Sequence, residues 1–183
     1  MSKQRFVLLL ILIGALSRLI PHPANFTALG AIALFAGAKI GKQYLDFLIP
    51  VAALWLSDLL VNNILYAAYY DSFIFFTEGF MYMAISMVLS VMVGRLVLSK
   101  MTTCRLLSGT LISSVLFFVI TNFGVWMATT PGYPQSFQGL MLCYEAAIPF
   151  FRNEFLGTLV YSGVFFGLYE WVFRSSLLPA KSR

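Results

Sequence analysis

Long apolar runs that carry almost no charge constrain this chain more than any other feature. Hydrophobic residues make up 60% of its 183 residues and charged residues only 10%. A soluble domain carries about 25% charged residues, because its surface must be hydrated. The composition therefore predicts a protein that lies in lipid. It argues against a soluble enzyme, a disordered tail and a disulfide-stapled secreted domain.

The apolar runs predict an all-α membrane protein that forms a single domain over residues 1–183. A helix needs roughly 20 apolar residues to cross the hydrocarbon core, whereas an open sheet cannot cross it with unpaired edges. We expect six transmembrane helices, with a long outer loop over 129–149. Their ranges are 5–20, 26–40, 45–69, 74–98, 104–128 and 151–173. The first two ranges are short, so each could be a tilted transmembrane helix or could end in a re-entrant loop.

The placement of Lys and Arg predicts how these helices are oriented. Cytoplasmic loops collect basic residues, and a cytoplasmic N-terminus puts all but two of the 12 Lys and Arg on the inner side. Only Arg18 and Arg152 then lie outside. We therefore expect a protein integral to the cytoplasmic (inner) membrane, with both termini cytoplasmic. This placement explains the net charge of +5 through contact with the lipid bilayer, without nucleic acid as a partner.

Polar side chains gather in the outer half of the predicted bundle. At about 1.5 Å per residue, Arg18 and Asp58 both lie about 20 Å from the inner face, so we expect them to pair. Asn62 follows Asp58 by one turn, and Asn122 and Trp126 reach a similar depth. Charged groups at this depth cost ~2.5–3.5 kcal/mol and usually mark function. Whether the Arg18–Asp58 pair is structural or functional stays open.

The connections on the outer side carry further candidate residues. His22 stands in the first one, without a second His or a Cys nearby in sequence, so we expect no metal site. Tyr133, Tyr144 and Phe150 belong to or follow the apolar segment 129–149. This segment is predicted to fold over the bundle as a lid, where these rings could stack on a planar ligand. The alternative is a half-helix that lies at the membrane interface.

Small residues recur every four positions in the predicted helix 26–40 and directly after it. Ala33, Gly37 and Gly41 follow one another at this spacing. Such residues allow two helix backbones to approach closely in a membrane. The sequence leaves open whether that contact is internal or with a partner.

Four segments carry a resemblance to known proteins. They are Arg18-x-x-Pro21-x-Pro-x-Asn25-Phe26, Ser57-Asp58, Thr121-Asn-Phe-Gly-x-Trp126 and Cys143-Tyr-x-Ala-x-x-Pro149-Phe150. They are similar to a family of small bacterial integral membrane proteins of unassigned function. With six helices and an outward site, the chain also resembles the S components of energy-coupling-factor vitamin transporters. That resemblance implies a coupling membrane protein with two ATPases as partner.

These observations predict a substrate-binding membrane subunit for uptake of a vitamin or related micronutrient from outside. We expect no enzyme activity, no cofactor and no metal; a structural or assembly subunit and an intramembrane enzyme are the alternatives. No Gly-x-x-x-x-Gly-Lys-Ser/Thr motif is present, so the chain hydrolyses no ATP itself. The range 5–20 lacks the Ala-xxx-Ala pair of S components, which leaves action without the energising module open. The candidate substrate-binding residues are Arg18, His22, Asn25, Asp58, Asn62, Asn122, Trp126, Tyr133, Tyr144 and Asn153.

Overall fold

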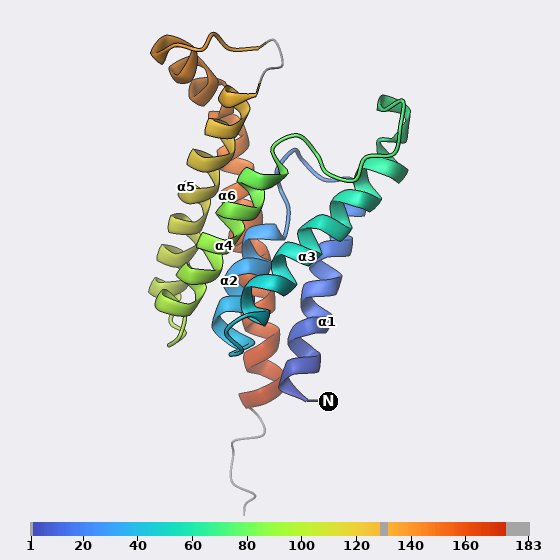
Figure 1. Ribbon diagram of the computed structural model, residues 1–183. Helices are drawn as coiled ribbons and strands as arrows, with labels where there is room; N and C mark the ends of the chain where they lie inside the picture. The colour runs from blue at the N-terminus through green and yellow to red at the C-terminus, as the bar shows by residue number, and fades with distance from the viewer. Residues whose placement is uncertain (1, 129–131, 175–183) are drawn as a thin grey trace, which may run out of the picture.

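The computed structural model describes residues 2–128 and 132–174. In these residues it has six α-helices and no strand, which confirms the all-α prediction. The helices are α1 (Lys3–Leu16), α2 (Leu29–Lys39), α3 (Leu45–Leu60), α4 (Phe80–Val97), α5 (Thr103–Met127) and α6 (Phe137–Arg174). Short helical turns follow α1 at Ser17–Leu19 and α3 at Val61–Leu65 and Ala67–Tyr69. The helices alternate in direction, so α1 begins and α6 ends at the same end of the bundle (Figure 1).

Within the described part of the chain, four segments are long and apolar enough to cross a membrane. They are Leu45–Leu65, Phe80–Val97, Thr103–Met127 and Phe137–Phe173. By this length and composition the chain is an integral membrane protein. The two remaining helices are shorter than predicted, with 14 residues in α1 and 11 in α2. At 1.5 Å per residue, α2 covers only about 16 Å, roughly half of the hydrocarbon core.

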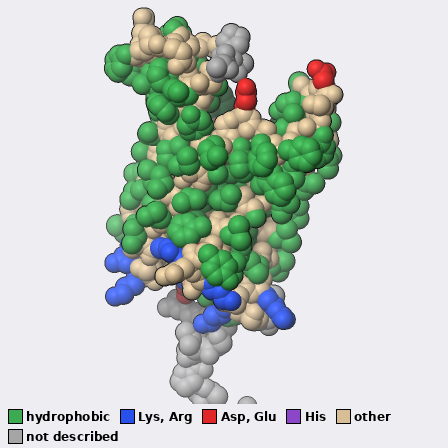
Figure 2. Space-filling view, in the orientation of Figure 1, with side chains coloured by type: hydrophobic (Ala, Val, Ile, Leu, Met, Phe, Trp, Pro, Cys, Tyr) green, Lys and Arg blue, Asp and Glu red, His purple; other side chains and the backbone are tan. Residues whose placement is uncertain are grey.

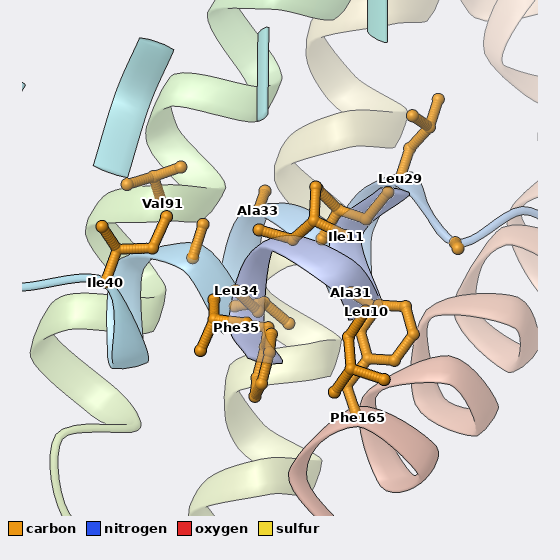
Figure 3. Close-up of a cluster of buried hydrophobic side chains, with 14 of the residues drawn as sticks. Leu10, Ile11, Leu29, Ala31, Ala33, Leu34, Phe35, Ile40, Val91 and Phe165 are labelled. Carbon is orange, nitrogen blue, oxygen red and sulfur yellow. The ribbon is translucent and has the colours of Figure 1, made fainter. Parts of the chain in front are cut away.

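The short helix α2 forms the centre of the bundle. Its residues from Ala31 to Gly37 are all buried, and every other α-helix contacts it. A helix that is apolar on all sides is stable when protein surrounds it completely. Figure 3 shows side chains of α1, α4 and α6 converging on α2, among them Leu10, Ile11, Val91 and Phe165. The core of the molecule is therefore built around its shortest α-helix.

Two glycines bring α2 and α4 into direct backbone contact. A Cβ atom at Gly37 would lie 2.1 Å from the carbonyl oxygen of Val91, and one at Gly94 would lie 2.3 Å from that of Leu34. The small-residue spacing in α2 thus serves an internal contact. Gly41 has a different role: its φ of +71° is left-handed, and it has no neighbour within 4 Å of an added Cβ, as suits a turn after a helix.

Helix α6 corrects the prediction of a long outer loop. Residues 137–149 are helical and continuous with the rest of α6, while residues 129–131 of the predicted loop lie outside the described chain. Pro149 falls inside the helix without ending it, which helices in membranes tolerate. With 38 residues, α6 is about 57 Å long at 1.5 Å per residue and exceeds the hydrocarbon core. Its first turns extend beyond the other helices (Figure 1).

Basic side chains gather at the end where α1 begins and α6 ends (Figure 2). We call this the basic end; its exposed members include Lys3, Arg5, Lys42, Lys100 and Arg105. The loop end, opposite, carries the connections 17–28 and 61–79 and the start of α6. Lys181 and Arg183, which the sequence also assigns to the basic side, lie outside the described residues. The structure thus gathers basic side chains at one end, as predicted.

Candidate functional site

A cavity of about 200 Å³ opens near the loop end, among α4, α5, α6 and the segment that precedes α2. Aromatic and aliphatic side chains form most of its wall. The lining residues are Asn25, Met83, Phe117, Phe118, Thr121, Asn122, Val125, Phe150, Phe151 and Glu154. An apolar wall with a few converging polar groups is typical of small-molecule sites.

The irregular segment before α2 places Asn25 at this cavity. Asn25 has a φ of +62°, a left-handed conformation that asparagine tolerates better than most residues. Asn153 of α6 donates a hydrogen bond from Nδ2 to the carbonyl oxygen of Ala24 at 3.0 Å. Gly157, one turn later, lets the segment approach, since a Cβ there would lie 2.9 Å from the backbone nitrogen of Thr27. Helix α6 therefore fixes the segment that closes one side of the cavity.

Glu154 supplies the one carboxylate among the described residues of the cavity wall. It is 6% exposed, and its Oε1 accepts a hydrogen bond from the hydroxyl of Thr158 at 2.8 Å. Ser114 of α5 faces the same carboxylate. Among the described residues, Oε2 and the Ser114 hydroxyl are both enclosed by protein, and neither forms a hydrogen bond of ordinary geometry. Burial of a carboxylate without full pairing is costly, so Glu154 is the residue of the cavity wall that a ligand could stabilise.

Glu154 stands at the loop end of a polar seam that runs between α4, α5 and α6. The seam consists of small buried hydroxyl residues, which allow helices to pack closely in a membrane. They are Ser86 and Ser90 on α4, Thr110, Ser113 and Ser114 on α5, and Thr158 and Ser162 on α6. The hydroxyl of Ser113 donates to that of Ser90 at 2.8 Å. Glu154, Thr158 and Ser162 repeat every four residues and so share one face of α6.

Two polar side chains of α5 turn back on their own helix at the cavity wall. Thr121 donates from its hydroxyl to the carbonyl oxygen of Phe117, and Asn122 from Nδ2 to that of Phe118, each at 2.7 Å. Such bonds to a carbonyl one turn earlier are common for short polar side chains in helices. The Thr121 hydroxyl and one N–H of the Asn122 amide are thereby used within α5, which leaves Glu154 as the acidic group of the wall.

The aromatic wall differs from the one predicted. Phe118 packs edge to face against Phe151, with ring centroids 5.2 Å apart, and against Tyr144, with centroids 5.5 Å apart. Tyr144 does not line the cavity; its hydroxyl donates to the carbonyl oxygen of Val119 at 2.6 Å. Tyr144 therefore supports the wall from behind.

Trp126 also lies away from the cavity lining. Its Nε1 donates to the carbonyl oxygen of Pro134 at 3.0 Å, and the side-chain amide of Gln135 donates to the carbonyl oxygen of Trp126. These bonds fasten the connection between α5 and α6. Trp126 and Tyr144, two of the residues predicted to bind substrate, therefore do not line this cavity.

The predicted Arg18–Asp58 pair is confirmed. Nη1 of Arg18 lies 2.6 Å from Oδ1 of Asp58 and also donates to the hydroxyl of Ser57 at 2.6 Å. The hydroxyl of Thr77 donates to Oδ2 of Asp58 at 2.9 Å. The pair joins the end of α1 to α3 and to the connection before α4. Both oxygens of Asp58 have partners, and neither charged residue lines the cavity, so the contacts favour a structural role.

The remaining predicted residues are distributed around the loop end. Asn62 is buried in the turn after α3, and Tyr133 is half-buried before α6. His22 is exposed, with Nδ1 2.6 Å from the carbonyl oxygen of Ile20. Of the predicted binding residues, Asn25 and Asn122 line the cavity. Sequence reasoning placed Glu154 at the start of the last helix without assigning it a role; its spacing of four from Thr158 is the signal that could have identified it.

Two larger hollows lie elsewhere. A groove of about 470 Å³ between α1 and α3 is lined by aliphatic side chains and by Ser57. A depression of about 540 Å³ at the basic end contains Lys39 and Glu170, whose charged atoms lie 3.4 Å apart. In the groove between α1 and α3, almost every lining side chain is apolar. In the depression at the basic end, the charges of Lys39 and Glu170 compensate each other. The cavity at Glu154 therefore offers the strongest chemistry for recognition.

Comparison with known proteins identifies a family. The model of a family described as "Family of unknown function (DUF6580)" matches residues 1–180. No curated protein and no solved structure matches the chain.

Proposed function

The chain belongs to the DUF6580 family, and we propose that it is a substrate-binding membrane subunit for uptake of a small molecule from outside the cell. The substrate class is a vitamin or related micronutrient, and the role resembles that of an S component in an energy-coupling-factor transporter. The observation that carries this proposal is the cavity near the loop end, whose largely apolar wall contains a buried acidic residue.

The distribution of charge supports an outward-facing cavity. Cytoplasmic segments collect Lys and Arg, so the basic end belongs in the cytoplasm and the loop end outside. Six helices of alternating direction then place both ends of the described chain on the cytoplasmic side. Glu154 lies roughly 30 Å along α6 from Arg174, near the outer boundary of a hydrocarbon core about 30 Å thick. A ligand would thus reach the cavity from the external water.

The cavity favours binding over a structural or catalytic role. A purely structural subunit gains nothing from a carboxylate that is buried beside an unfilled space. An intramembrane enzyme would need a nucleophile with a base, or paired carboxylates. Glu154 is the single carboxylate among the described lining residues, and the hydroxyl of Thr121 is engaged by its own helix. These groups suit the binding and release of a substrate that undergoes no chemical reaction.

The proposal is tested by identifying what the purified protein retains. Native mass spectrometry detects a co-purifying small molecule, and a micronutrient library is screened for compounds that raise the melting temperature. Phe150→Ala removes a ring from the cavity, whereas Phe137→Ala removes an exposed ring from the same helix. We expect ligand binding in the wild type and in Phe137→Ala, with loss in Phe150→Ala. Absence of any retained or stabilising small molecule in the wild type would contradict the proposal.

A further inference from the structure

We propose that the ligand of this cavity is a small organic ammonium ion, whose N–H group donates to the carboxylate of Glu154 between phenylalanine rings. The inference rests on the proposed function, since it names the chemical class of the molecule that the cavity takes up. It starts from Glu154, a buried acidic residue that lines the cavity and whose polar partners in the described structure are the hydroxyl groups of Thr158 and Ser114.

The charge of the cavity selects a cation. Among its described lining residues, Glu154 is acidic and no Lys, Arg or His is present. Neighbouring basic groups are directed elsewhere: Arg18 pairs with Asp58 at 2.6 Å, Arg152 is exposed, and His22 is exposed and contacts a backbone carbonyl. An anionic ligand would meet an uncompensated like charge, and a neutral ligand would leave the carboxylate charge unbalanced. A cation removes both penalties.

The hydrogen-bonding state of Glu154 selects a donor. Oε1 receives the Thr158 hydroxyl and the Ser114 hydroxyl faces the same carboxylate, but two hydroxyl groups leave part of the accepting capacity of the two oxygens unused. An ammonium N–H supplies the missing donor together with the charge, which makes the bond shorter and stronger than one between neutral groups.

The wall favours an organic cation over a metal ion. Phe117, Phe118, Phe150 and Phe151 surround the space next to the carboxylate. The faces of aromatic rings attract cations within about 6 Å of the ring centroid. Ca²⁺ and Mg²⁺ instead require about six oxygen ligands, which a wall made largely of phenylalanine does not provide. The volume of about 200 Å³ is below the ~300–1,000 Å³ of sites for drug-sized ligands, so the ammonium ion must be small.

The test compares cations with neutral molecules of the same shape. The probes are benzylammonium with benzyl alcohol, and n-butylammonium with n-butanol, titrated onto the full-length protein in nanodiscs. We expect the ammonium member of at least one pair to bind at least tenfold more tightly than its alcohol. Glu154→Gln keeps the side-chain shape and should reduce ammonium binding at least tenfold, whereas Glu170→Gln at the basic end, the same change on the same helix, should leave it intact.

The outcomes separate this inference from the proposed function. If neither pair shows a preference for the cation, the inference is overturned, and this comparison needs no variant. A neutral or anionic co-purified ligand that Glu154→Gln retains as tightly as the wild type would also overturn the inference, while it would support a substrate-binding role. If Glu154→Gln does not fold, Glu154→Asp replaces it: the retained charge should preserve the preference for the cation, with weaker binding. Loss of the preference in folded Glu154→Asp would contradict the proposal.

Discussion

Gly30 of α2 makes room for Thr158 of α6: a Cβ at Gly30 would lie 2.3 Å from the Thr158 hydroxyl oxygen and 3.2 Å from Oε1 of Glu154. The absence of a side chain at Gly30 thus lets the central helix contact Thr158 and Glu154, of which Glu154 lines the cavity. The position of the Glu154 carboxylate depends on this contact between α2 and α6. Packing at the core and geometry at the site are coupled through one glycine.

Gly30→Ala should therefore affect both stability and binding. The added methyl group must displace Thr158, and overpacking of this kind costs about 1–3 kcal/mol of unfolding free energy. The shift should also disturb Glu154 and weaken ligand binding. Gly163→Ala on α6 is the control, because nothing lies within 4 Å of its added Cβ. Thermal unfolding in detergent measures the difference; equal melting temperatures for the two variants would contradict this coupling.

The Arg18–Asp58 pair predicts strong non-additivity. Asp58→Ala leaves the half-buried guanidinium of Arg18 without its carboxylate, and breaking a buried pair costs about 3–5 kcal/mol. The double change Arg18→Leu with Asp58→Leu should cost less than either single change, because no charge is left unpaired. A double-mutant cycle from denaturation midpoints measures the coupling, and additive losses would show that the pair contributes no interaction energy.

The sequence predicts which residues of two helices meet at the same membrane depth, but it does not predict the cavity. Depth along two helices that run in the same direction was enough to pair Arg18 with Asp58. Pro149 suggested a break, yet the structure continues α6 through it, because the sequence does not show which neighbouring groups accommodate a proline. The cavity itself arises where α4, α5 and α6 meet the segment around Asn25. That meeting depends on packing between segments far apart in sequence, so the role of Glu154 emerged only from the structure.

Aromatic side chains that line the cavity should respond to substitution differently from those that pack behind the lining. Phe118 lines the cavity, so Phe118→Leu should weaken ligand binding several-fold while costing under about 1.5 kcal/mol in stability. Tyr144 lies behind Phe118, so Tyr144→Phe should remove one hydrogen bond, worth about 0.5–1.5 kcal/mol, and leave affinity nearly unchanged. Titration and thermal unfolding of both variants separate the two effects. A larger loss of affinity in Tyr144→Phe would place the ligand nearer to Tyr144 than the cavity does.

The two cysteines provide a direct test of orientation. Cys104 is exposed near the basic end, and Cys143 is buried, so a membrane-impermeant maleimide should label Cys104 only after the cells are permeabilised. In a Cys104→Ala background, a cysteine introduced at Ser136 should be labelled in intact cells. Cys143 should remain unlabelled under both conditions and serves as the internal control. Labelling of Cys104 in intact cells would reverse the orientation and close the cavity to the external side.

Two of the buried carboxylates, those of Asp58 and Glu154, should respond to replacement with opposite signs. Asp58 has partners on both oxygens, so removing its charge destabilises the fold as described above. Glu154 is buried without full pairing, and an unsatisfied buried group costs about 1–3 kcal/mol. Glu154→Met, which fills a similar volume without charge, should therefore raise the melting temperature of the ligand-free protein; the hydroxyl of Thr158 can then bond to a backbone carbonyl one turn earlier. The same variant should lose ligand binding, because a destabilising group that persists at a site usually serves function. A lower melting temperature for Glu154→Met would mean that the carboxylate is structurally paired, and that Glu154 does not mark a binding site.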